Sequence, residues 1–413
     1  MMLRRRDIPA LLLPLIAISC KRAARTDPES TTDWETTRPD EAGFRTAELQ
    51  KLSADIHAGQ FPNTHAVLIE RDGRLVCEQY FAGSDEIWGG AVENRTLVAS
   101  SLHDLRSVSK SVTSALVGIA LAKDFDQAVA RPIRSFFPNR KLRPQLDAIK
   151  LRHVLTMTAG FEWNEMTVPY TDSQNDEGRM YSVKDPIGFV LARPVRDTPG
   201  ARWYYCSGLT MVLAGVVEQI TGKPFDVFAR EALFTPLGIT DYEWLGSFDT
   251  NPRMPSAASG LRLRARDLAR FGSVYLHGGQ WRGRQIVPAA WVERSTQRQV
   301  SVGDLKANSS KTTFTYGMGS EDANWGYGYQ WWVGQMGGVD FAAAVGLGNQ
   351  RVFVVPSERL VVTIFAGEYN KLGGHSEHIF ARVLSARAPR ARVAKLCKLI
   401  SEVDTFLRKS SGD

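Results

Sequence analysis

The chain reads Ser107-Val108-Ser109-Lys110-Ser111-Val112-Thr113-Ser114-Ala115-Leu116 at the start of an apolar run that repeats every 3.6 residues. Apolar side chains at 108, 112, 115, 116 and 119 predict a largely buried helix over 107–123. Lys110 follows Ser107 by three residues, so both lie on one helical face. Because a buried ammonium loses its hydration, we expect a lowered pKa for Lys110 and a neutral amine that can serve Ser107 as a base.

The Ser-x-x-Lys pattern is short, and a second interpretation stays open at this stage. Ser107 could simply cap the helix, with the Lys110 amine in solvent.

Two further segments carry groups suited to the same chemistry. Tyr205 lies in Trp203-Tyr204-Tyr205-Cys206-Ser207-Gly208, a loop before a predicted helix over 209–220. It can transfer protons if a cation such as Lys110 holds its phenol near ionisation, and its alternative role is core packing. Leu347-Gly348-Asn349-Gln350 precedes a predicted strand, and backbone N–H groups there can polarise a carbonyl. The alternative is an ordinary hairpin turn.

These stretches resemble, in order along the chain, the class C β-lactamase-like serine hydrolases. The segment 107–116 resembles the first motif of that family, and similar matches occur at 155–163, 265–272 and 281–288. The resemblance covers about residues 60–386. Tyr205-Cys206-Ser207 stands where the family has Tyr-x-Asn, and its Cys-Ser form is most similar to the 6-aminohexanoate-dimer hydrolase and carboxylesterase branch.

The resemblance implies a mechanism and a site. Ser107 would attack a carboxylic ester or amide, and Lys110 and Tyr205 would move the protons. The acyl-enzyme would then be hydrolysed without a metal or cofactor. The Ser107 N–H and a backbone N–H of the Leu347–Gln350 turn, which includes Gly348, would bind the oxyanion. Other residues are placed at the substrate by their positions in the sequence: Ser207, Tyr170, Trp203, Tyr327 and Trp332.

Two departures from the family pattern bear on the substrate. Ser207 replaces an asparagine amide, and Leu347-Gly348-Asn349 replaces the Lys-Thr-Gly or His-x-Gly motif whose cation would bind a substrate carboxylate. Lys311-Thr312-Thr313 mimics that motif but lies in a polar stretch. We therefore expect neutral esters or amides rather than penicillins or D-Ala-D-Ala peptides. The alternatives are a β-lactamase, a D-Ala-D-Ala peptidase, or a catalytically silent binding module on the same fold.

The order of predicted elements indicates an α/β (α+β) fold of the β-lactamase/DD-peptidase type. A hairpin around Arg71-Asp72-Gly73 comes first, then a helical lobe over about 124–255. Strands at 328–333, 353–356 and 360–366 and a helix over 374–384 come last. Both ends of the chain thus build one antiparallel sheet, flanked by helices with a helical lobe inserted. The predicted hydrolase domain spans 45–386.

The two ends of the chain are predicted to lie outside this domain. Arg4-Arg5-Arg6 and the apolar run 8–19 form an export signal, and Ala17-Ile18-Ser19-Cys20 resembles a lipobox. Export to the periplasm, or anchoring to a bacterial membrane through a lipidated Cys20, is therefore expected. Residues 21–44 would be a flexible tether, and 387–413 a basic tail or amphipathic helix.

Other functional classes find little support. The chain has 51 Lys and Arg against 44 Asp and Glu, without a basic stripe for nucleic acid. Cys20, Cys77, Cys206 and Cys397 match no zinc or disulfide pattern, and Cys77 and Cys206 are expected to be small buried residues. No Gly-x-Ser-x-Gly elbow occurs, and His375-Ser376-Glu377-His378 is not a zinc spacing. The expected partner is a small-molecule ester or amide.

Overall fold

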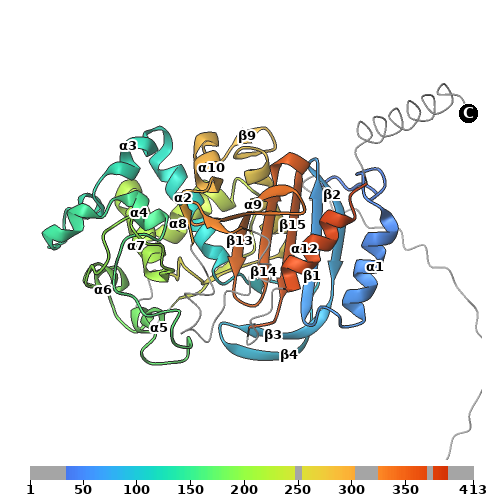
Figure 1. Cartoon of the computed structure of the whole chain (residues 1–413), viewed down its shortest axis with the longest axis horizontal. Helices are drawn as coiled ribbons and strands as arrows, with labels where there is room; N and C mark the ends of the chain where they lie inside the picture. Colours follow the sequence, from blue (N-terminus) through green and yellow to red (C-terminus); the bar gives the residue numbers. More distant parts are fainter. Residues whose placement is uncertain (1–33, 247–253, 303–323, 370–374, 389–413) are drawn as a thin grey trace, which may run out of the picture. The chain divides into compact units, whose positions relative to one another are not determined.

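The fold is given by a computed structural model that describes residues 34–246, 254–302, 324–369 and 375–388. The body from Glu35 onward is built on one eight-stranded antiparallel sheet (Figure 1). Its strands, in spatial order, are β10 (Val300–Ser301), β11 (Gly326–Tyr327), β12 (Trp332–Met336), β13 (Val339–Gly346), β14 (Gln350–Val355), β15 (Leu360–Ala366), β1 (Thr64–Arg71) and β2 (Arg74–Tyr80).

The pairing of β1 with β15 joins the two ends of the chain in the middle of this sheet. Val67 lies opposite Ile364 and Ile69 opposite Val362, and every residue of both strands is buried. β1 and β2 are joined by Asp72-Gly73, both with left-handed φ angles of 56° and 80°. This is the predicted Asp-Gly hairpin.

Helices cover both faces of the sheet, as neighbouring residues of β14 demonstrate. Val352 packs at Gly272 of α9 (Ala265–Leu276), and a Cβ on Gly272 would lie 2.7 Å from the Val352 side chain. The next residue, Phe353, stacks on Phe380 of α12 (His375–Ser385) with ring centroids 4.0 Å apart. Successive side chains of a strand point to opposite faces, so α9 and α12 cover opposite sides.

The remaining helices form mainly the lobe that is inserted between β2 and the late strands. α2 (Val108–Leu121) lies between the sheet and this lobe and contacts both β13 and α7 (Figure 1). The other described helices are α1 (Thr46–His57), α3 (Phe125–Ala130), α4 (Leu151–Leu155), α5 (Asp176–Tyr181), α6 (Pro186–Leu191), α7 (Ser207–Thr221), α8 (Phe225–Ala229) and α10 (Ala289–Thr296). Within the described residues, no helix has the length and apolarity needed to cross a bilayer.

Short strand pairs complete the fold. β3 (Ala82–Ile87) and β4 (Gly90–Thr96) form a separate hairpin. β5 (His103–Asp104) pairs with β7 (Leu261–Leu263), which in turn pairs with β6 (Glu243–Trp244). A last pair joins β8 (Gln280–Trp281) to β9 (Arg284–Gln285).

The predicted fold class is confirmed, with differences in detail. Strand β13 was not predicted, and 328–331 is not a strand. Residues 35–44 do not form a free tether: Phe44 is buried and Thr36 bridges Leu75, so the packed body begins before the predicted boundary at 45. The predicted signal, lipobox and Lys311-Thr312-Thr313 loop lie outside the described residues, as does 389–413 of the predicted tail.

Candidate active site

Ser107 occupies the position directly before α2, where the chain makes a strained turn. Arg106 has a left-handed φ of 48°, and its carbonyl accepts a hydrogen bond of 2.7 Å from the Ser109 hydroxyl. The α2 helix begins at Val108, so Ser107 sits at the positive end of the helix dipole. Ser107 itself is half-buried, which leaves its hydroxyl within reach of a substrate.

The Lys110 amine faces inward, which excludes the surface-lysine interpretation. Lys110 is 2% exposed. Its Nζ donates to Ser107 Oγ at 2.9 Å and to the Ala258 carbonyl at 3.0 Å. Burial lowers the pKa of Lys110, and the carboxylates of Glu177 and Glu165 partly oppose that shift. The geometry and the pKa shift together suit a base that removes the Ser107 proton.

Tyr205 joins this pair from the loop before α7. Its phenol hydrogen-bonds Ser107, and the Lys110 amine lies over its ring, 4.9 Å from the centroid. Burial and the Glu165 carboxylate nevertheless raise the pKa of Tyr205 well above its usual range. This direction of shift favours the protonated phenol and is opposite to the expectation that a cation would bring Tyr205 near ionisation.

Glu165, which the sequence analysis missed, organises the start of α7. One carboxylate oxygen accepts from the Ser207 N–H at 2.7 Å and from the Trp163 indole at 2.7 Å. The other accepts from the Ser207 hydroxyl at 2.6 Å and from the Tyr170 phenol at 3.3 Å. A carboxylate is favourable at this helix N-terminus. The predicted substrate residues Ser207 and Tyr170 therefore both turn their hydroxyl protons toward Glu165.

A second buried carboxylate, Glu177, lies on α5 near the Lys110 amine. Its Oε1 accepts from the Ser259 hydroxyl at 3.2 Å, and Ser259 follows the Ala258 carbonyl that binds Lys110. Burial and the Glu165 carboxylate raise the pKa of Glu177, and Lys110 lowers it. Two carboxylates near one amine make this an acidic site. Glu165 lies two residues beyond the stretch 155–163 that resembles the family. The only feature of the sequence that could have pointed to it is an acidic residue so close to Phe161 and Trp163.

The three other predicted pocket aromatics pack behind Tyr205. Trp332 stacks on Tyr205 at 6.4 Å and an interplanar angle of 22°, and Trp203 lies 6.3 Å from Tyr205. Tyr327 contacts both tryptophans. All of them are less than 10% exposed, so they support the Tyr205 ring rather than line an open surface.

The predicted oxyanion turn joins β13 to β14 and lies close to the nucleophile. Gly346 approaches the Leu105 carbonyl so closely that a Cβ there would stand 2.2 Å from its oxygen. Gly348 and Asn349 have left-handed φ angles of 84° and 68°. The Gln350 side chain points inward and donates to the Ala366 and Gly348 carbonyls. The Gln350 side chain is therefore occupied within the protein, and the backbone of Leu347–Gln350 remains the candidate for binding an oxyanion.

Of the two described cysteines, Cys206 is buried as expected, whereas Cys77 is only half-buried. Cys77 and Cys206 are free thiols. Burial raises the pKa of Cys77 to about 12 and that of Cys206 well above its usual value.

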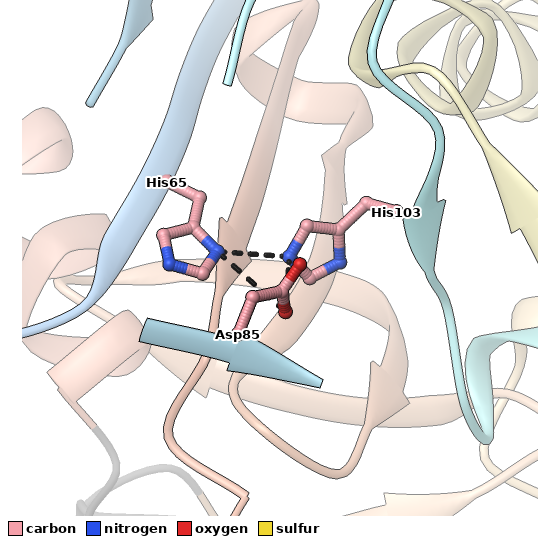
Figure 2. A group of neighbouring side chains, drawn as sticks. All are labelled: His65, Asp85 and His103. Carbon is pink, nitrogen blue, oxygen red and sulfur yellow. Dashed lines mark hydrogen bonds and ion pairs between the residues drawn. The ribbon is translucent and has the colours of Figure 1, made fainter. Parts of the chain in front are cut away.

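Within the described residues, one group has the composition of a metal site. His65 of β1, Asp85 of β3 and His103 of β5 converge in a fully buried cluster (Figure 2). His65 Nδ1 lies 2.9 Å from His103 Nε2, and Asp85 Oδ1 lies 4.0 Å and 3.3 Å from these two nitrogens. A point equidistant from the three atoms is about 2.0 Å from each, a distance that zinc accepts.

The partners of this cluster favour a metal-free network instead. Asp85 is ion-paired with Arg95 and accepts from the Tyr369 phenol at 3.2 Å. The two imidazoles hydrogen-bond each other, and burial lowers the pKa of His103 to about 3, which keeps it neutral. The protein itself thus satisfies the charge of Asp85, and the cluster ties three strands together.

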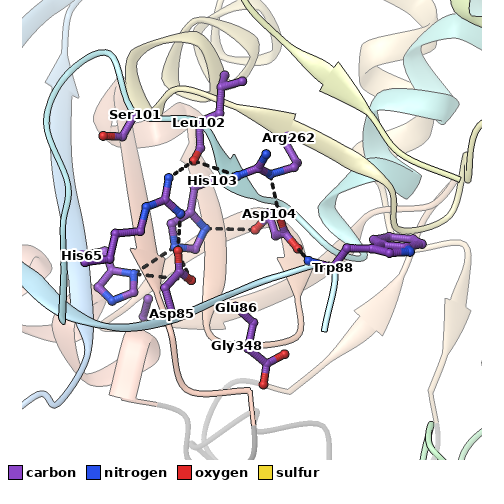
Figure 3. Close-up of polar contacts among 12 residues, drawn as sticks. His65, Asp85, Glu86, Trp88, Ser101, Leu102, His103, Asp104, Arg262 and Gly348 are labelled. Carbon is purple, nitrogen blue, oxygen red and sulfur yellow. Dashed lines mark hydrogen bonds and ion pairs between the residues drawn. The ribbon is translucent and has the colours of Figure 1, made fainter. Parts of the chain in front are cut away.

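The same network continues to the residues just before Ser107 (Figure 3). Asp104 accepts from the Trp88 N–H at 2.7 Å and is ion-paired with Arg262 at 2.7 Å and with Arg106 at 3.4 Å. The β3–β4 hairpin, β5, β7 and the strained Arg106 turn are therefore held as one unit.

Comparison with known proteins agrees with this geometry. The Beta-lactamase family model matches residues 56–385. The chain belongs to this family. A 6-aminohexanoate-dimer hydrolase from Paenarthrobacter ureafaciens is 27% identical over 360 residues, covering 85% of this chain and 81% of that protein. A protein from Escherichia coli strain K12, provisionally named a D-alanyl-D-alanine carboxypeptidase, is 24% identical over 56% of this chain. The chain spans only about half of that relative, 54% of its length.

A solved structure shares the fold. EstCE1, a hydrolase with promiscuous acyltransferase activity, superimposes with a TM-score of 0.61 at 17% identity, covering 85% of this chain and 99% of that one. The family and fold predicted from the sequence are confirmed, and the family is one of serine hydrolases.

Proposed function

We propose that the chain hydrolyses a carboxylic ester or amide through an acyl-enzyme on Ser107. The observation that carries the proposal is the 2.9 Å contact between Lys110 Nζ and Ser107 Oγ, with the amine buried and the Tyr205 phenol bonded to the same serine. These are the relations that a serine nucleophile and its proton-transfer groups need.

In the proposed reaction, Lys110 and Tyr205 carry the protons between Ser107 and the leaving group. As Ser107 Oγ attacks the substrate carbonyl, its proton passes to the neutral Lys110 amine. The carbonyl becomes an oxyanion, which the Ser107 N–H and a backbone N–H of the Leu347–Gln350 turn would bind. When the C–O or C–N bond breaks, Tyr205 gives its proton to the leaving group and regains one from Lys110. Water then attacks the acyl-enzyme by the same route, which releases the acid and restores Ser107.

The charge of the site favours substrates without a carboxylate near the reacting carbonyl. Leu347-Gly348-Asn349 supplies no cation, and Glu165 and Glu177 place negative charge beside Lys110. An anionic penicillin or peptide C-terminus would be repelled. One relative named above acts on an amide dimer, and we extend amide and ester chemistry to this chain on that basis.

A fluorophosphonate probe tests the nucleophile. The wild-type chain should be labelled on the Ser107 peptide, and Ser107→Ala should not. Ser135→Ala is the matched control, because Ser135 is exposed, its hydroxyl bonds only the neighbouring Pro132 carbonyl, and its loss should leave labelling intact. A folded wild-type protein that takes no label would favour the silent binding module.

Intact-protein mass spectrometry then separates the substrate classes. The panel is p-nitrophenyl acetate, a p-nitroanilide, nitrocefin and a D-Ala-D-Ala peptide. We expect acylation by the first two, while turnover of nitrocefin or the peptide alone would favour the β-lactamase or peptidase alternative.

We further propose that the chain is exported and that Cys20 is lipidated. The support is the Arg4-Arg5-Arg6 cluster, the apolar run 8–19 and the Ala17-Ile18-Ser19-Cys20 sequence. Metabolic labelling with a palmitate analogue should mark the wild type and not Cys20→Ala. Unlabelled wild-type protein in the cytosolic fraction would contradict both parts.

A further inference from the structure

The tip of the β3–β4 hairpin presents an indole to solvent. Trp88 is 36% exposed, one of the few large apolar side chains exposed in the described residues. It has a left-handed φ of 49°, which non-glycine residues rarely adopt. Asp104 holds this conformation in place, because it accepts a hydrogen bond of 2.7 Å from the Trp88 N–H and is itself ion-paired with Arg262 (Figure 3). Asp104 is also ion-paired with Arg106.

The indole is connected to the catalytic pair from two directions. On one side the Arg106 guanidinium lies 5.8 Å from the Trp88 ring, and Arg106 directly precedes Ser107. On the other side the Tyr181 ring meets Trp88 edge-on at 6.3 Å. The Tyr181 hydroxyl lies 3.2 Å from Ser259 Oγ, next to the carbonyl that binds Lys110. Two short chains of contacts, one through Arg106 and one through Tyr181 and Ser259, therefore connect Trp88 to Ser107 and Lys110.

The polar groups of Arg106 and Tyr181, the two residues that contact the Trp88 ring, already have partners within the protein. Arg106 is ion-paired with Glu86 at 3.3 Å and with Asp104 at 3.4 Å. The Tyr181 hydroxyl is bonded to Ser256 and Ser259. What remains for a ligand is aromatic ring surface, which binds flat or aliphatic groups by burial and stacking.

We propose that Trp88 and Tyr181 form a subsite for an apolar aryl or alkyl substituent of the substrate. The subsite rests on the proposed ester or amide hydrolysis and specifies its substrate class. The rigid anchoring by Asp104 holds the indole at a fixed place beside the nucleophile, so longer apolar substituents gain a contact that an acetyl group cannot reach.

Steady-state kinetics on p-nitrophenyl esters and on phenyl and alkyl acetates tests the subsite. One series lengthens the acyl group from acetyl through hexanoyl to benzoyl, and the other enlarges the leaving group. Trp88→Gly removes the indole and suits the left-handed turn, whereas Trp88→Phe retains a ring. In at least one series, Trp88→Gly should lower the ratio of kcat/KM for the largest to the smallest substrate about 10-fold, mainly through KM. Trp88→Phe should lose less than half of that discrimination.

The control is Val98→Ala, a change at another exposed apolar residue, 53% exposed, which should leave both series unchanged. Equal ratios in wild type and Trp88→Gly across both series would overturn the subsite and leave the proposed hydrolysis standing. Failure of the wild type to hydrolyse any ester or amide would overturn the hydrolysis and the subsite together.

Discussion

Replacement of Glu165 provides a quantitative test of how the site is held. Its carboxylate accepts four hydrogen bonds. Two come from the Ser207 N–H and the Trp163 indole N–H, which can act only as donors. Two come from the Ser207 and Tyr170 hydroxyls, which can act as donors or acceptors. In Glu165→Leu the two N–H donors stay buried without partners. At about 1–3 kcal/mol each, the loss in the free energy of unfolding should be about 2–6 kcal/mol.

Glu165→Gln should be much milder because the amide can take a compatible orientation. Its oxygen can face the two N–H donors, and its NH2 can face the Ser207 and Tyr170 hydroxyls, which turn to accept. The remaining loss is the charge assistance of the bonds, about 1–2 kcal/mol. Glu162→Leu is the control, because Glu162 makes a surface ion pair with Arg196 and should change stability by less than about 1 kcal/mol.

Urea denaturation followed by tryptophan fluorescence measures these differences from the midpoints and slopes. Active-site labelling by the fluorophosphonate probe reports in parallel whether Ser207 and Tyr205 keep their places. If Glu165→Leu unfolds within about 1 kcal/mol of wild type, or if the Leu and Gln variants are equally stable, the hydrogen-bond assignment is wrong.

Three other changes have defined outcomes. Lys110→Met keeps the volume but removes the base, so kcat/KM should fall about 10²–10⁴-fold in steady-state assays while stability stays within about 1 kcal/mol. Glu177→Gln removes the carboxylate that most raises the pKa of Lys110, so the rising limb of kcat/KM against pH should move to lower pH. Gly118→Ala would place a Cβ 2.3 Å from Trp291, and calorimetry should show destabilisation of about 1–3 kcal/mol.

Each of these three predictions has a result that would contradict it. A Lys110→Met enzyme with near wild-type kcat/KM would remove the amine from the mechanism. A rising limb that stays in place, or moves to higher pH, in Glu177→Gln would show that this limb does not report Lys110. The same profile in Glu162→Gln should match wild type. A Gly118→Ala protein as stable as wild type would mean that Trp291 moves aside freely.

The helices were predictable because their apolar residues recur with the 3.6-residue period of a helix. The helix expected at 209–220 is observed as α7, Ser207–Thr221, and the one expected at 107–123 as α2, Val108–Leu121. Strand β13 escaped because Phe341-Ala342-Ala343-Ala344 has low strand propensity and is stabilised by pairing with β12 and β14.

Ser107 and Lys110 were predictable as a pair because they share one helical turn. The relation of Tyr205 to them was suggested by its place on a loop before a helix and made specific by the family resemblance. The acids were found by neither route. Glu165 and Glu177 reach the site through separate segments, the loop after α4 and the helix α5, and nothing in their local sequence marks them as buried. Burial of a carboxylate is decided by tertiary packing, so it appears only in the structure.

Burial, more than the two acids, separates the protonation of Lys110 from that of Tyr205. A carboxylate stabilises an ammonium and destabilises a phenolate, so Glu165 raises the pKa of Lys110 and also that of Tyr205. Burial, however, acts in opposite directions on the two, lowering the pKa of the amine and raising that of the phenol. Lys110 is thereby moved toward neutrality, where it can accept a proton, and Tyr205 is kept protonated, where it can only give one. Because Glu165 raises both pKa values, its loss would lower both, and burial would still separate the amine from the phenol.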